Sequence, residues 1–168
     1  MKSISRSLIF LLAAITFLSC ERDDICVDPT TPKLILRFYD SENPELFKQV
    51  VNLKVSIIGT EGEYVNETLG ALTDSVALPV NVDGDLTRYE LTLQGSESQG
   101  TEDNTDVFQI TYTQEDLFVS RPCGFKAVFN EVQTGLESDE DNWIDAAIPS
   151  ASPLDINNEN SAHVKIYH

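Results

Sequence analysis

The sequence predicts an all-β protein: a single β-sandwich of the Ig-like or Greek-key type, with about 8–9 antiparallel strands after a signal peptide. Short runs in which apolar and polar residues alternate recur along the chain, and a period of two is typical of half-buried strands. Turn-forming residues separate these runs, and no run after the signal peptide has a helical period. A β-barrel is the alternative arrangement of such strands.

The expected strands begin at residue 33. In the first, 33–39, Leu34, Leu36 and Phe38 share one face. Further strands are expected at 52–58, 75–82, 85–91, 107–113, 117–121, 125–132, 143–148 and 162–167. The aromatic residues expected on inward faces are Phe38, Tyr89, Phe108, Tyr112 and Phe125. Residues 95–106 and 135–142 are expected to be loops because they are rich in polar and acidic residues.

The dipeptide Asp83-Gly84 lies between two alternating runs and predicts a β-hairpin with a type I′ turn. A two-residue loop would pair Leu78 with Tyr89 and Val76 with Leu91. These pairs are apolar and fall on one face, so the turn and the hydrophobic pattern predict the same register.

The first 19 residues have the features of a secretory signal. Lys2 and Arg6 precede the apolar run Leu8–Leu18, which is shorter than the roughly 20 residues that a membrane span needs. The end of the run, residues 17–20 (FLSC), resembles the bacterial lipobox, in which the peptidase cuts before a diacylated cysteine. Phe17 differs from the usual Leu, and an ordinary signal peptide that happens to contain a Cys is the alternative.

Three cysteines, an odd number, need an explanation in an exported protein. If Cys20 carries lipid, Cys26 and Cys123 remain as one pair, in a compartment where disulfides form and persist. Two free buried thiols are the alternative. Because six residue steps separate Cys20 from Cys26, the tether reaches at most about 20 Å. A bridged Cys26 would therefore keep the domain close to the membrane surface.

The chain is strongly acidic, with a formal net charge of −17. Removal of residues 1–19 would leave 149 residues, enough for one domain with a core. Nucleic-acid binding depends on basic patches that neutralise phosphates. No such patch occurs in the sequence, so we expect no nucleic-acid partner.

The chain resembles a family of uncharacterised small lipoproteins from flavobacteria and their relatives in the Bacteroidota. The segments that carry the likeness are residues 20–26, 31–40 (TPKLILRFYD), 118–126 (FVSRPCGFK), Trp143 and 162–168 (AHVKIYH). The acidic residues 21–24 also resemble surface-export signals of that group. The resemblance implies an outer-membrane lipoprotein, periplasmic or surface-exposed, from a family without an assigned activity.

No catalytic, metal or cofactor site is expected. A catalytic triad needs a histidine beside a nucleophile, whereas His163 and His168 lie in the last six residues, and their odd spacing in a strand places them on opposite faces. The acidic stretches 81–85 and 137–141 lack the flanking helices of an EF-hand. Trp143, beside an acidic loop, is the candidate ligand-binding residue, and a role as a core residue is the alternative.

These observations predict a signal peptide at 1–19, a lipidated tether at 20–32 and a β-sandwich domain at 33–168. The expected function is that of a lipid-anchored envelope protein, not an enzyme, which acts as a structural or protein-interaction module. A glycan- or ligand-binding surface lipoprotein is the alternative. The expected partners are the membrane, reached through the N-terminal lipid, and an envelope protein or a glycan.

Overall fold

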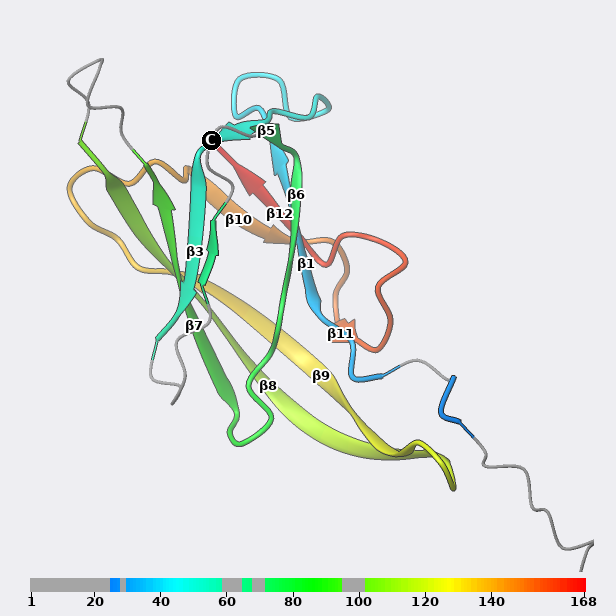
Figure 1. The fold of residues 1–168 in the computed structure, drawn as a ribbon. Coiled ribbons are helices and arrows are strands. Elements are labelled where there is room, and N and C mark those ends of the chain that lie inside the picture. The colour runs from blue at the N-terminus through cyan, green and yellow to red at the C-terminus, as the bar shows by residue number, and fades with distance from the viewer. Residues whose placement is uncertain (1–24, 28–29, 59–64, 68–71, 95–101) are drawn as a thin grey trace, which may run out of the picture.

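The computed structural model describes residues 25–27, 30–58, 65–67, 72–94 and 102–168, and every regular element in these ranges is a β-strand (Figure 1). The prediction of an all-β protein is therefore confirmed. The predicted signal peptide, and Cys20 as the predicted lipidation site, lie outside the described residues.

The strands form three sheets. One contains, in spatial order, β10 (Ala146–Pro149), β12 (Val164–Tyr167), β1 (Leu34–Tyr39) and β6 (Ser75–Leu78). The largest contains β11 (Leu154–Ile156), β9 (Gly124–Leu136), β8 (Asn104–Ser120), β7 (Leu86–Leu93), β3 (Leu53–Ile57) and β4 (Val65–Glu67). The third is the short pair β2 (Val50–Val51) and β5 (Leu72–Thr73).

The prediction that all strands are antiparallel is wrong for one pair. β1 and β12 run parallel, with Leu36 opposite Val164 and Tyr39 opposite Tyr167. Parallel neighbours cannot be joined by a tight turn, and these two strands come from opposite ends of the domain. Sequence alternation predicts which face of a strand is buried but carries no information about its direction in the sheet.

Buried side chains of both large sheets belong to one hydrophobic core. Its fully buried members include Leu34, Leu36, Phe38, Leu53, Leu78, Tyr89, Leu91, Phe108, Ile110, Phe129, Ile156, Val164 and Ile166. Of the five aromatic residues predicted to point inward, Phe38, Tyr89, Phe108 and Tyr112 are buried. The prediction is wrong for Phe125, which is 68% exposed.

The predicted hairpin at Asp83-Gly84 is also wrong. β6 pairs with β1, whereas β7 pairs with β3 and β8, so the two runs belong to different sheets. Pro79 has no N–H for a ladder, and its carbonyl accepts a hydrogen bond from the hydroxyl of Tyr89 at 2.9 Å. The N–H of Asn81 donates to Thr87 Oγ1 at 3.0 Å. Leu78 and Tyr89 are both buried as predicted, but each on its own sheet.

The longest strands form the β8–β9 hairpin, which extends away from the rest of the molecule in Figure 1. β8 joins the two strands predicted at 107–113 and 117–121, and it begins inside the predicted loop 95–106, of which residues 95–101 lie outside the described ranges. β9 extends four residues beyond the predicted 125–132. Residues 114–116, between the two predicted strands, pair in regular register with 127–129, so one strand continues through what the sequence suggested was a break.

Candidate functional site

The end of the β8–β9 hairpin is the candidate functional site. Ser120 of β8 lies opposite Gly124 of β9, and residues 121–123 form the turn between them. Gly124 has a φ of +70°, a conformation that residues with a Cβ rarely adopt. The glycine therefore allows the chain to reverse directly after Cys123.

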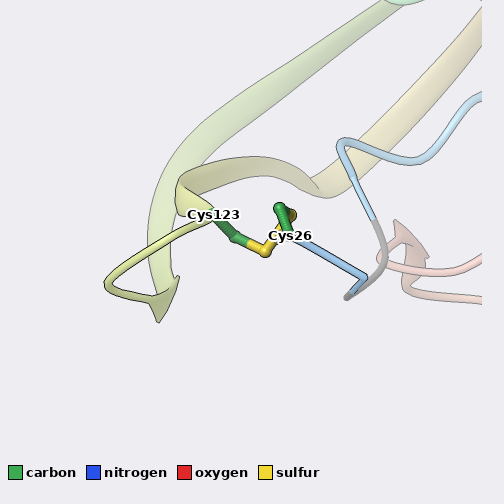
Figure 2. Close-up of a disulfide and its surroundings, with 2 residues drawn as sticks. All are labelled: Cys26 and Cys123. Carbon is green, nitrogen blue, oxygen red and sulfur yellow. A yellow bond between two sulfur atoms is a disulfide. The ribbon is translucent and has the colours of Figure 1, made fainter. Parts of the chain in front are cut away.

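Cys123 in this turn is bonded to Cys26 of the N-terminal segment (Figure 2). Their Cα atoms are 4.8 Å apart, within the usual range for disulfides. The structure thus contains the disulfide that the cysteine count predicted. Farther along the same segment, Thr31 Oγ1 accepts a hydrogen bond at 3.0 Å from the N–H of Ala127 on β9, and Pro32 is buried. The N-terminal segment is therefore fastened at two points, to the turn that precedes β9 and to β9 itself.

An exposed apolar cluster lies at this end of the hairpin, on the two segments that the disulfide joins. Phe118 and Phe125 lie opposite each other on β8 and β9, and their rings meet edge to face with centroids 5.4 Å apart. Phe118 is 60% exposed, and Ile25 and Val27, on either side of Cys26, are more exposed still. Sequence reasoning placed Phe125 in the core because its run is apolar. Phe125 is exposed because the end of the β8–β9 hairpin extends away from the rest of the molecule (Figure 1).

A second surface, which we call the Tyr39 face, consists of Arg37, Tyr39, Phe47, Lys165 and Tyr167. The ring of Tyr39 lies 5.5 Å from that of Tyr167 and 5.1 Å from that of Phe47, between centroids. The guanidinium carbon of Arg37 lies 4.0 Å from the Phe47 ring centre, and Lys165 Nζ lies 5.4 Å from that of Tyr39. The face thus combines aromatic rings with cations in an acidic protein.

Trp143, the predicted ligand-binding residue, is partly buried and packs against the core. Its indole Nε1 donates a hydrogen bond to the carbonyl of Leu91 at 2.9 Å. The ring centroid lies 6.4 Å from that of Phe38 and 5.5 Å from that of His168. These contacts give Trp143 a packing role. It does not belong to the Tyr39 face or to the cluster at the disulfide.

Asp106 is a fully buried carboxylate that the sequence placed in a loop. It accepts hydrogen bonds from the N–H groups of Ile144 at 2.8 Å and Trp143 at 3.3 Å. Burial raises the pKa of Asp106 above its ordinary 3.8, and these two donors oppose the shift. Asp106 lies on the same face of β8 as Phe108, so a period of two extended backwards from Phe108 could have identified it.

The two histidines have separate environments. The Nδ1 atom of buried His163 accepts a hydrogen bond from the N–H of Ile35 at 2.9 Å, and Nε2 lies 2.9 Å from the carbonyl of Asn158. These partners require a neutral ring with its proton on Nε2. Burial lowers the pKa of His163 below 6.5, against the effects of the Asn158 carbonyl and Glu159. Burial also lowers the pKa of His168.

We predict that the free energy of unfolding depends on the protonation of His163. Because the folded-state pKa is lowered, the stabilising effect of the neutral ring is fully present above pH 6.5 and is lost as the pH falls from 6.5 through the folded-state value. Replacement of His163 by Gln should therefore reduce the loss of stability between pH 7.5 and 5.5, which urea titrations at several pH values can measure. Equal pH dependence in both proteins would contradict this assignment. His168→Gln removes the other histidine whose pKa is lowered by burial and measures the separate contribution of that residue.

A hollow of about 990 Å³ lies beside β9, β10 and β11. Glu131 is the one acidic residue that lines it, so this hollow does not offer the pair of carboxylates that glycoside hydrolysis uses. In the described ranges, no three His, Cys, Asp or Glu side chains are grouped so that they could hold a metal ion. No helix long and apolar enough to span a bilayer occurs in those ranges.

A family model matches residues 52–168 of the chain, and its description is a family of unknown function, DUF6452. The match includes Cys123, the β8–β9 hairpin and Trp143, whereas Cys26 and β1 precede it. Neither a curated protein nor a solved structure matches the chain.

Proposed function

The chain belongs to the DUF6452 family, and we propose that this member is an outer-membrane lipoprotein that holds a non-enzymatic structural or protein-interaction domain close to the bilayer. Acyl chains on Cys20 anchor the protein, and the Cys26–Cys123 disulfide fastens the tether to the domain. The core shared by the two large sheets supports a β-sandwich as the scaffold of that domain.

The observation that carries this proposal is the position of the disulfide. Cys26 is six residue steps from Cys20, so the bonded cysteine stays within about 20 Å of the lipidated residue. Its partner Cys123 lies at the end of the longest hairpin. A lipid on Cys20 also accounts for the one cysteine that has no role in this disulfide. The resemblance to flavobacterial lipoproteins supports the outer membrane as the location.

Fatty-acid labelling in a bacterial host that processes lipoproteins tests the proposal. The wild type and Cys26→Ser should incorporate labelled fatty acid, because both retain Cys20. Cys20→Ser should incorporate none. Cys26→Ser is the matched control, since it removes a neighbouring thiol by the same change. An unlabelled wild-type protein, or equal labelling of all three, would refute the lipoprotein assignment.

The alternative proposal is that the protein binds a glycan or another ligand, and the Tyr39 face supports it. Aromatic rings carry negative charge on their faces and attract the polarised C–H groups of a sugar ring. Lys165 would favour an anionic glycan, whereas the guanidinium of Arg37 already lies 3.4 Å from the carboxylate of Asp74. On a glycan array, Tyr167→Ala should lose binding that Trp143→Phe retains. If Trp143→Phe loses binding and Tyr167→Ala retains it, Trp143 is the ligand-binding residue. If neither the wild type nor the variants bind any glycan on the array, this alternative is refuted.

A further inference from the structure

The hairpin tip, defined as residues 117–126, exposes large apolar side chains that have no partner surface among the described residues. Phe118 and Phe125 contact each other, and Leu117, on the opposite face of β8, is also exposed. Such rings are usually buried, because the transfer of an apolar ring out of water lowers the free energy. Exposed apolar clusters of this kind mark sites of interaction with proteins or membranes.

The N-terminal segment adds to the same cluster. The Cys26–Cys123 disulfide brings Cys26 to the turn of the hairpin (Figure 2). Its neighbours Ile25 and Val27 are 80% and 87% exposed. Apolar side chains from two distant parts of the sequence are therefore gathered at one end of the molecule.

The charge of the tip is opposite to that of the whole chain. Residues 117–126 contain Arg121 and Lys126 and no acidic residue, although the chain has 28 acidic residues and a net charge of −17. The nearest acids along the chain, Glu115 and Asp116, precede the tip. An acidic protein is repelled by anionic headgroups; residues 117–126 add nothing to this repulsion, whereas Asp24 and Asp28, two residues from Cys26 on either side, are acidic.

We propose that the hairpin tip inserts Phe118 and Phe125 into the interfacial region of the bilayer, where the long side chains of Arg121 and Lys126 reach the headgroup phosphates. This inference rests on the proposed lipid anchor, because the short stretch between Cys20 and Cys26 keeps the tip within about 20 Å of the lipidated residue. Apolar and aromatic side chains flanked by basic residues are typical of interfacial insertion. The tip and the acyl chains then act as two membrane attachments on one short tether.

The insertion would orient the domain. In Figure 1 the C-terminus lies at the end of the molecule opposite to the hairpin tip. Tyr167 of the Tyr39 face directly precedes the C-terminal residue. A protein standing on its hairpin tip therefore presents the Tyr39 face away from the membrane, where a partner could reach it.

Quenching of tryptophan fluorescence in the intact lipoprotein tests the proposal. The wild type contains a single tryptophan, Trp143, which packs against the core and so reports on the domain itself. The variants Phe118→Trp and Phe125→Trp each add one ring at the tip. The matched control Phe47→Trp adds one at an exposed position on the Tyr39 face. Each protein is reconstituted into phosphatidylcholine vesicles with or without lipid brominated near the headgroup end of the acyl chain.

We expect brominated lipid to remove most of the emission added by Phe118→Trp and Phe125→Trp, and none of that added by Phe47→Trp. Unquenched tip variants on a protein whose mass shows the acyl chains would overturn the insertion and leave the lipid anchor intact, and a protein partner would then be the occupant of the tip. A protein without acyl chains would instead refute the proposed function. Two tip positions are used so that one misfolded variant does not decide the result.

Discussion

Loss of the Cys26–Cys123 disulfide is expected to lower the free energy of unfolding by about 4 kcal/mol. The two cysteines are 97 residues apart in the sequence, so the bond restricts a long loop of the unfolded chain. The chain-entropy model gives about 4.7 kcal/mol for a loop of about 100 residues, and removal of native disulfides typically costs about 2–5 kcal/mol. The double variant Cys26→Ser, Cys123→Ser removes the bond without leaving a free thiol at either position.

Urea unfolding with and without a reducing agent measures this effect. The wild type should lose stability when reduced and then match the double variant, which should not respond to the reductant. If the wild type and the double variant unfold at the same urea concentration in the absence of reductant, the disulfide does not stabilise the domain. The double variant should keep its lipid, because Cys20 is unchanged.

Replacement of Asp106 by Ala is expected to lower the free energy of unfolding by about 2–4 kcal/mol. The carboxylate accepts hydrogen bonds from the N–H groups of Trp143 and Ile144, and the change leaves one partly buried and one buried donor without their acceptor. A buried donor without a partner costs about 1–3 kcal/mol, and hydrogen bonds to charged groups are at the strong end of this range. The segment that carries Trp143 should therefore loosen from the core.

Asp106→Asn is the matched variant for this prediction. It keeps the side-chain volume and one acceptor oxygen, so it should lose about half as much stability as Asp106→Ala. Trp143 is the only tryptophan of the chain, and its fluorescence can report on the loosening during thermal unfolding. An Asp106→Ala protein as stable as the wild type would show that the two hydrogen bonds make no net contribution.

The sequence predicted the strands that bury one face and could not predict how they pair. The period of two in 33–39 identified Leu34, Leu36 and Phe38 as core residues, and all three are fully buried. The same reasoning correctly placed Leu78 and Tyr89 inside. It then paired their strands across Asp83-Gly84, although β6 and β7 belong to different sheets. Side-chain alternation is a local property, whereas strand order depends on contacts between distant parts of the chain.

The candidate site was predicted in part. The odd number of cysteines was enough to propose the Cys26–Cys123 bond, because lipid on Cys20 leaves a single pair. The exposed rings of Phe118 and Phe125 were missed, since an apolar run has the same appearance whether it lies in the core or extends beyond it. Asp106 was missed because the residues before it are polar and the predicted strand began at Val107, although Asp106 shares the buried face of Phe108.

The claim that one short segment connects lipid, disulfide and domain can be tested by mass spectrometry of the protein purified from membranes without reduction. Chymotrypsin should release residues 20–34 with acyl chains on Cys20, joined through Cys26 to the fragment 119–125 that contains Cys123. We expect this single linked species, which separates into its two fragments on reduction. An unmodified residue 20, or fragments that are separate before reduction, would contradict the claim.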